Sequence, residues 1–167
     1  MNADFSVVAV RELASPDSPT VELDGIVPLS YRLRDVPPGS GYFMFRGSPR
    51  RLLEVGVSYT DQAVTSLTIV AYEASGAWPD LSIDRRQQGV PVLATRFSDY
   101  EIVDVELTFG VAVDGRRVVA YWGALGRCAA IEMGRSAFLV RDSTLVGFLV
   151  SDLTVEEVEA FHHSASP

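Results

Sequence analysis

The sequence predicts an α+β fold in which about ten short, mostly antiparallel strands form a twisted sheet or sandwich and one helix ends the chain. Short runs of alternating apolar and polar residues, separated by turn residues at regular intervals, are typical of antiparallel strands. A segment with the pattern of a β-hairpin also occurs twice. The chain of 167 residues is 47% hydrophobic, which is enough for a single domain with one core over residues 1–167.

The repeated segment is the strongest local signal. Residues 52–73 read LLEVGVSYTDQAVTSLTIVAYE, and residues 102–123 read IVDVELTFGVAVDGRRVVAYWG. They align without a gap, so each is expected to form a strand, a polar turn and a second strand. In the second copy, Asp114-Gly115 is the predicted turn. One face of its first strand is expected to point inward: Val103, Val105, Leu107 and Phe109.

The other strands follow from the same alternation, and the chain ends in a predicted helix. Strands are expected over 5–13, 21–23, 27–33, 42–46, 90–95, 135–140 and 144–150. Residues 74–88 are polar and are expected to form a loop. Thr154 and Glu157 have the spacing of a capping box, so a helix is expected to begin directly after Thr154.

Charge and residue types exclude several classes of function. The net charge of −8 argues against binding to nucleic acid or to an anionic membrane, because both need positive surface. All 14 basic residues are arginine, which excludes catalysis by a lysine amine and a P-loop. Without a signal-peptide pattern or an apolar run long enough to span a bilayer, a cytoplasmic protein is expected.

Neither a cofactor nor a metal site is predicted, and no residue is assigned a catalytic role. Cys128 is the only cysteine, so no disulfide can form within the chain, and its small apolar neighbours predict a buried thiol. His162 and His163 are adjacent near the end of the predicted helix, where their side chains point about 100° apart and do not readily grip one ion.

Carboxylates are the abundant reactive side chains. Four of them lie in one stretch that holds no arginine: Asp99, Glu101, Asp104 and Glu106. On a strand, Asp104 and Glu106 share a face, with side chains roughly 7 Å apart. Three interpretations stay open, namely a solvated sheet face, an acidic patch that binds a basic partner, and general acid–base chemistry.

The segment from Tyr72 to Asp80 combines aromatic and acidic residues. Tyr72, Trp78 and Asp80 are typical of protein-binding loops, because Tyr and Trp contribute large contact areas at low entropic cost. The alternative for Trp78 is that its side chain folds back as a lid over the sheet.

As a whole, the chain resembles the immunity proteins that bacteria keep beside contact-dependent and other polymorphic toxins. The resemblance lies in the short, acidic, β-rich profile, in the segment VDVELTFGVAVDGRRVVAYWG and the strand pair after it, and in the ending SDLTVEEVEAF. It implies a protein that binds and blocks a cognate toxin domain, often a basic nuclease. The resemblance itself assigns no site residue.

The sequence therefore predicts a toxin-neutralising immunity protein, without enzymatic activity, whose partner is a basic protein. The expected contact residues are Asp99, Glu101, Asp104, Glu106, Tyr72, Trp78 and Asp80. The alternative is a β-domain that binds a small molecule or uses carboxylates for catalysis.

Overall fold

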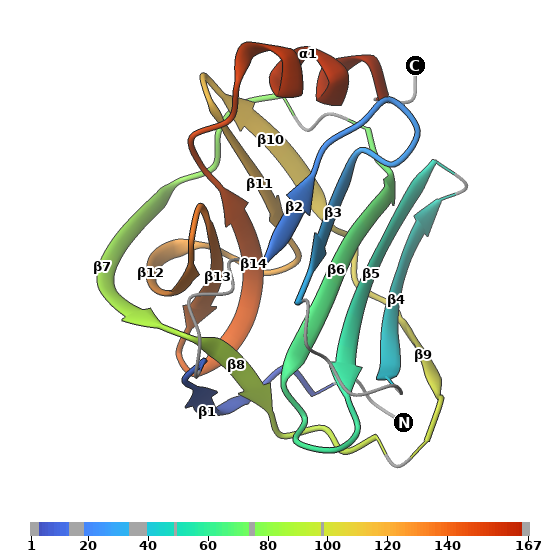
Figure 1. The fold of residues 1–167 in the computed structure, drawn as a ribbon, viewed down its shortest axis with the longest axis vertical. Helices are drawn as coiled ribbons and strands as arrows, with labels where there is room; N and C mark the ends of the chain where they lie inside the picture. Colours follow the sequence, from blue (N-terminus) through green and yellow to red (C-terminus); the bar gives the residue numbers. More distant parts are fainter. Residues whose placement is uncertain are drawn as a thin grey trace.

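The computed structural model describes residues 4–13, 19–33, 40–48, 50–73, 76–97 and 99–164. Over this part of the chain it has fourteen strands in three sheets and one C-terminal helix, which confirms the predicted, mostly antiparallel α+β fold. In Figure 1 the two large sheets lie next to each other, with α1 (Val155–Ser164) across one end and a small two-stranded sheet at the other.

Each large sheet has six strands. The first sheet has the order β10-β11-β14-β13-β12-β7. Its strands are β10 (Gly110–Asp114), β11 (Arg117–Tyr121), β14 (Thr144–Val150), β13 (Ser136–Arg141), β12 (Gly126–Met133) and β7 (Leu81–Gln88). The second sheet has the order β2-β3-β6-β5-β4-β9. Its strands are β2 (Thr20–Glu22), β3 (Leu29–Arg32), β6 (Val64–Ala71), β5 (Arg51–Ser58), β4 (Ser40–Ser48) and β9 (Ile102–Val105).

The third sheet pairs β1 (Val7–Arg11) with β8 (Val90–Leu93). Among the strand pairs that the structure describes, two are parallel, β7 with β12 and β9 with β4. Each of them adds an edge strand to one of the large sheets.

Aromatic side chains fill the space between the two large sheets. Tyr31 on β3 packs edge-on against Phe138 of β13 and Phe148 of β14, with ring centroids 5.3 and 5.1 Å away. Phe45 on β4 meets Trp122, which follows β11, at 5.2 Å. Burial raises the pKa of Tyr31 far above its ordinary value, because the phenolate would lose its water. These contacts join both sheets in one apolar core.

The opposite face of the first sheet is also covered. A smaller cluster of buried residues lies there: Ala112, Val119, Leu125, Cys128, Ala130, Ala137, Leu139, Val146 and Leu149. Trp78, Leu81 and Ile83 pack against it from the start of β7. Cys128 is buried as predicted, and burial raises the pKa of its thiol. Because both faces of the sheet are buried at its centre, β11, β13 and β14 read as nearly continuous apolar runs.

The repeated segment forms a complete hairpin only in its first copy, where β5 and β6 pair antiparallel. In the second copy, residues 102–105 form β9 in the second sheet, whereas β10 and β11 form a hairpin in the first sheet. Asp114 pairs with Arg117 in that hairpin, so its turn consists of Gly115 and Arg116, one position later than predicted, and Gly115 has a φ of 56°. The expectation of two equivalent hairpins is therefore wrong, because the chain changes sheets between β9 and β10.

This change of sheets also alters one predicted strand face. Val103, Val105 and Phe109 are buried as expected. Leu107 lies in the connection between β9 and β10 and is exposed, so its predicted inward position is wrong. Alternation of side chains ends where the strand ends, and the connection places Leu107 by different geometry.

Residues 74–88 differ from the predicted loop as well. Their second half forms β7, an edge strand that runs parallel to β12. Ile83 faces the small core, whereas the charged stretch 84–86 is exposed. An edge strand keeps one long side in solvent, so its polar sequence looks like that of a loop. Strand β12 itself is not among the strands predicted from the sequence.

Helix α1 begins as predicted. The Thr154 hydroxyl accepts a hydrogen bond from the Glu157 N–H (3.2 Å), and Glu157 Oε2 accepts one from the Thr154 N–H (2.8 Å). This reciprocal capping box satisfies two backbone donors that the first turn leaves free. Within the residues described above, no helix is long and apolar enough to cross a membrane.

Candidate binding face on the second sheet

The outward face of the second sheet carries side chains in two rows that cross all six strands. Strand register gives the first row: Thr20, Arg32, Ser66, Gly56, Tyr42 and Ile102. The second row runs beside it: Glu22, Ser30, Thr68, Glu54, Met44 and Asp104. The residues between the rows, such as Tyr31, Phe43 and Leu67, are buried in the core. Because side chains alternate along a strand, both rows face away from the core.

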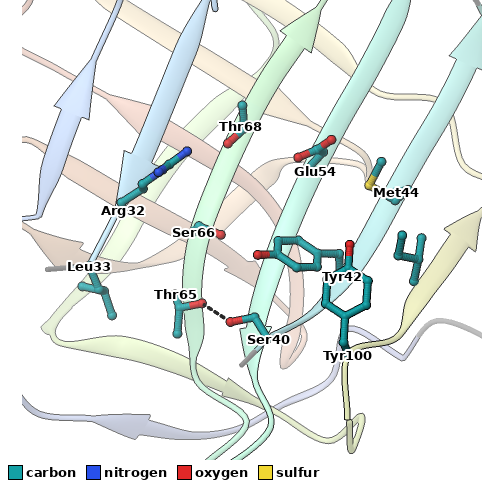
Figure 2. Close-up of a pocket in the computed structure, with 11 residues that line it drawn as sticks. Arg32, Leu33, Ser40, Tyr42, Met44, Glu54, Thr65, Ser66, Thr68 and Tyr100 are labelled. Atoms are coloured by element: carbon teal, nitrogen blue, oxygen red, sulfur yellow. Dashed lines mark hydrogen bonds between the residues drawn. The ribbon is translucent and has the colours of Figure 1, made fainter. Parts of the chain in front are cut away.

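Gly56 has a definite role in the first row. A Cβ atom at this position would lie 2.2 Å from Ser66 Oγ and 3.2 Å from Tyr42 Cε1. In Figure 2 the Tyr42 side chain extends from β4 across β5 toward β6. An aromatic ring that covers a glycine on the neighbouring strand stabilises a sheet. Only a glycine at position 56 leaves room for this arrangement.

The two rows line a hollow of about 500 Å³, which is drawn in Figure 2. Its lining consists of Arg32, Leu33, Ser40, Tyr42, Met44, Glu54, Thr65, Ser66, Thr68, Tyr100 and Ile102. A second depression of about 480 Å³ lies over β2 and β3 and shares Arg32, Leu33 and Thr68 with the first. The face is thus hollowed from β2 to β9.

Opposite charges line the hollow without an ion pair between them in the described part of the chain. Arg32 on β3 is exposed, and Glu54 on β5 is half-buried. Strand β6 lies between them with Ser66 and Thr68 (Figure 2). With strands about 4.8 Å apart, β3 and β5 are separated by roughly 10 Å. Guanidinium, carboxylate and hydroxyl groups together offer hydrogen-bond donors and acceptors to a ligand.

Tyr100 stands at the β9 side of the hollow. Its ring centroid lies 5.9 Å from that of Tyr42, and the residue is 67% exposed. Ile102 beside it is 48% exposed. The Tyr100 N–H donates to Asp99 Oδ1 (2.7 Å), and the Tyr42 N–H donates to the Glu101 carbonyl (2.8 Å). The second bond fixes the short loop before β9 against β4.

The four predicted acids lie along this same edge. Asp99 and Glu101 flank Tyr100, Asp104 ends the second row, and Glu106 follows β9. Asp104 forms an ion pair with Arg46 of β4, with 2.7 Å between Nε and Oδ1. Over the described ranges the other three carboxylates have no ion pair, and all four lie at the surface or near it.

Tyr72 does not belong to this face. It is 1% exposed, its ring stacks on Phe161 of α1 at a centroid distance of 4.5 Å, and its hydroxyl donates to the Phe161 carbonyl at 2.6 Å. The expectation that Tyr72 is an exposed anchor is therefore wrong. The strand β6 ends just before Tyr72, and the helix covers its ring.

The Trp78 side chain folds back over the first sheet as a lid, which is the alternative that the sequence left open. It packs on the small core of the first sheet, and the Arg117 guanidinium lies 4.7 Å from its ring centroid. Asp80 is exposed, and its carbonyl accepts a hydrogen bond from the Gly126 N–H at 2.8 Å. The first sheet positions both residues, and neither lies in the hollow. Residues 74 and 75 of the same segment lie outside the described ranges.

Other reactive groups do not gather into a site. Among the residues placed by the structure, no group of three or more His, Cys, Asp and Glu side chains has the arrangement of a metal site. His162 and His163 are exposed at the end of α1, and His163 Nδ1 lies 2.7 Å from the Glu159 carbonyl oxygen. Cys128 is enclosed in the small core.

Sequence reasoning missed most of the hollow. Arg32, Tyr42 and Glu54 come from the successive strands β3, β4 and β5, but β6 lies between β3 and β5 in the sheet, so the strand register is needed to place them on one face. The sequence does contain one signal, since Tyr100 lies inside the acidic stretch 99–106. Tyr100 and Ile102 in that stretch also indicate a contact site, because hot spots favour aromatic over acidic side chains.

Comparison with protein-family models finds none that matches, and comparison with curated proteins finds no matching relative.

Proposed function

We propose that the protein is a binding protein that docks a basic partner protein on the outward face of the second sheet and thereby blocks it. The resemblance to immunity proteins supports a toxin domain as this partner. One observation carries the proposal. The hollow is continuous with the acidic edge at β9, where the exposed Tyr100 and Ile102 stand among Asp99, Glu101 and Asp104.

This arrangement combines the two features that protein recognition needs. Tyr100 and Ile102 supply apolar area, and loss of a central anchor of this kind costs about 2 kcal/mol or more of binding free energy. The carboxylates at the rim, together with the net charge of −8, favour association with a basic surface. Asp104 contributes less than its neighbours, because Arg46 already compensates its charge.

A second candidate function is the binding of a small polar molecule in the hollow. Arg32 and Glu54 both line it, and neither forms an ion pair within the described residues. A ligand with several hydroxyl or amide groups could bond to both side chains and to Ser66 and Thr68. A thermal-shift screen of small polar compounds tests this candidate, with Glu54→Gln as the variant that should lose any response.

The main proposal is tested by capture of partners from the host lysate at low and at high salt. We expect the tagged protein to retain a basic protein at low salt. High salt should weaken this binding, because screening removes part of the charge attraction. Tyr100→Ala should reduce capture strongly. Val8→Ala is the matched control, because Val8 is also exposed but lies on β1, outside the second sheet.

Equal capture by the Tyr100→Ala variant would remove this face from the proposal. Capture of no basic partner at either salt concentration would overturn the proposed function itself and leave the small polar ligand as the better candidate.

A further inference from the structure

The edges of the second sheet differ in how they are closed. At the β2 edge, Arg135 Nη2 donates a hydrogen bond to the Val21 carbonyl (3.0 Å), so a side chain from the turn between β12 and β13 covers the middle of this strand. At the other edge lies β9, which Figure 1 places at the rim of the molecule. Over the ranges that the structure covers, no hydrogen bond reaches the free side of β9.

The direction of the free backbone groups follows from one hydrogen bond. The Tyr42 N–H donates to the Glu101 carbonyl, and the parallel register pairs Tyr42 with Ile102. Successive peptide groups along a strand point to opposite sides. The N–H and C=O of Val103 are therefore directed at β4, whereas those of Ile102 and Asp104 are directed away from the sheet.

The side chains of these two residues are accessible as well. Ile102 is 48% exposed and lines the hollow, and the Asp104 side chain is 69% exposed. A strand added beside β9 would meet both the free backbone groups and this mixed apolar and acidic side-chain row. Its side chains on the same face would lie next to Tyr100 and the hollow.

We propose that β9 is the docking edge of the partner, which adds an extended segment with basic side chains as a seventh strand of the second sheet. This inference rests on the proposed function and gives its mode of recognition. Main-chain hydrogen bonds to Ile102 and Asp104 would supply affinity, and alternate side chains would supply specificity.

Charge selects the occupant of this edge. Arg46 compensates Asp104, but Asp99, Glu101 and Glu106 flank β9 without an ion pair in the described ranges, so a second copy of this edge would bring like charges together, which is destabilising. Acidic side chains on an edge strand thus oppose self-association. The same carboxylates attract arginine or lysine side chains on a foreign strand, so a basic segment of another protein fits better than a second copy of this chain.

The test uses the full chain and a defined probe, the blocked peptide Ac-Arg-Val-Arg-Val-Arg-Val-NH2. Its control is the same peptide with N-methyl groups on the four central residues, which removes strand pairing but keeps the charge. We expect the first peptide to slow amide exchange at Ile102 and Asp104 by about tenfold or more, as measured by NMR. The amides of Val103 and Val105, already bonded to β4, should change little.

Two variants give a second measurement. Asp104→Pro removes an N–H that β4 does not use, and proline is tolerated on the free side of an edge strand. Asp104→Asn keeps that N–H and loses only the charge. We expect Asp104→Pro to abolish the effect of the peptide and Asp104→Asn to weaken it. Amide spectra confirm that each variant is folded.

Equal responses to the two peptides, no response to either, or a response confined to residues away from β9 would overturn the inference. Failure of the inference is distinguishable from failure of the proposed function. A lysate partner that binds Asp104→Pro as tightly as the parent chain leaves the function standing and refutes the strand mode. Specific peptide pairing without any protein partner supports the strand mode and refutes the function.

Discussion

Arg135 and Glu157 form a two-pronged ion pair, with 2.8 Å between Nη1 and Oε2 and 2.6 Å between Nη2 and Oε1. Arg135 follows the β12 strand, Glu157 belongs to α1, and Arg135 also reaches the Val21 carbonyl of β2 at 3.0 Å. One guanidinium therefore connects the first sheet, the helix and the edge of the second sheet. Such bidentate, charge-assisted contacts are stronger than ordinary surface ion pairs.

We expect Glu157→Gln to lower the free energy of unfolding by about 1–2 kcal/mol at neutral pH. The hydrogen bond from Arg135 lowers the pKa of Glu157 below its ordinary value of 4.5. Its contribution is present above pH 4.5 and is lost as the pH falls through the lower pKa of the folded state. Denaturant unfolding of both proteins from neutral to acid pH measures the difference, which should shrink with acidification. Glu159→Gln, on an exposed part of the same helix, is the control.

Tyr72 gives a prediction for alkaline conditions. Burial raises its pKa from 10.0 to about 12. The neutral phenol therefore stabilises the fold below pH 10, and this contribution is lost as the pH rises toward 12. Tyr72→Phe removes one of two hydrogen bonds to the Phe161 carbonyl, which keeps the bond from Ser164 Oγ (2.7 Å), so the loss should be about 1 kcal/mol at neutral pH. The variant should lose less stability than the parent chain at alkaline pH, and Tyr100→Phe, an exposed tyrosine, should behave like the parent.

Gly56→Ala tests the packing around the hollow. The new methyl group would lie 2.2 Å from Ser66 Oγ and 3.2 Å from Tyr42 Cε1, so both side chains must move. We expect a loss of about 1–3 kcal/mol of stability, together with weaker capture of the partner. Gly25→Ala is a matched control, because nothing lies within 4 Å of a Cβ atom there. Unchanged stability in the Gly56 variant would contradict the role given to Tyr42.

Trp78 and Tyr100 should respond in opposite ways to truncation. Trp78 packs on the small core, so Trp78→Ala should lower stability by about 2 kcal/mol and leave partner capture unchanged in the protein that remains folded. Tyr100→Ala removes an exposed ring, so it should reduce capture and hardly change stability. Thermal unfolding and lysate capture of both variants make the comparison. Reversed behaviour would restore Trp78 as a partner contact.

The elements predicted best from the sequence were those with local causes. The Thr154–Glu157 capping box and the β5–β6 hairpin depend on residues close in the chain, and both formed as expected. The prediction of a complete hairpin in the second copy is wrong, because the alternation in residues 102–109 does not reveal that the chain passes from one sheet to the other. β7 was missed because exposure of an edge strand gives it the polarity of a loop.

The candidate site was predictable only at its edge. The acidic stretch 99–106 does border the hollow, since Ile102 lines it and Asp104 ends a row. Arg32, Tyr42 and Glu54 had no signal beyond being outward positions of separate strands, and the register that joins them is a property of the folded sheet. The prediction for Tyr72 is wrong because α1 buries its ring. The contact residue Phe161 lies 89 positions further along the chain, so no local pattern reveals the burial.

Strands β7, β8 and β9 follow one another in the chain, yet each belongs to a different sheet. Residues 81–105, called the belt below, therefore connect all three sheets through one continuous segment. The hairpins β5–β6, β10–β11 and β13–β14 close short loops, whereas β7 and β9 find parallel partners far along the chain. Because closing long loops delays folding, the hairpins should form early and the belt should dock late. The edge at β9 would then be among the last parts of the molecule to fold and among the first to open. Such local opening would make its backbone available for pairing with a partner strand.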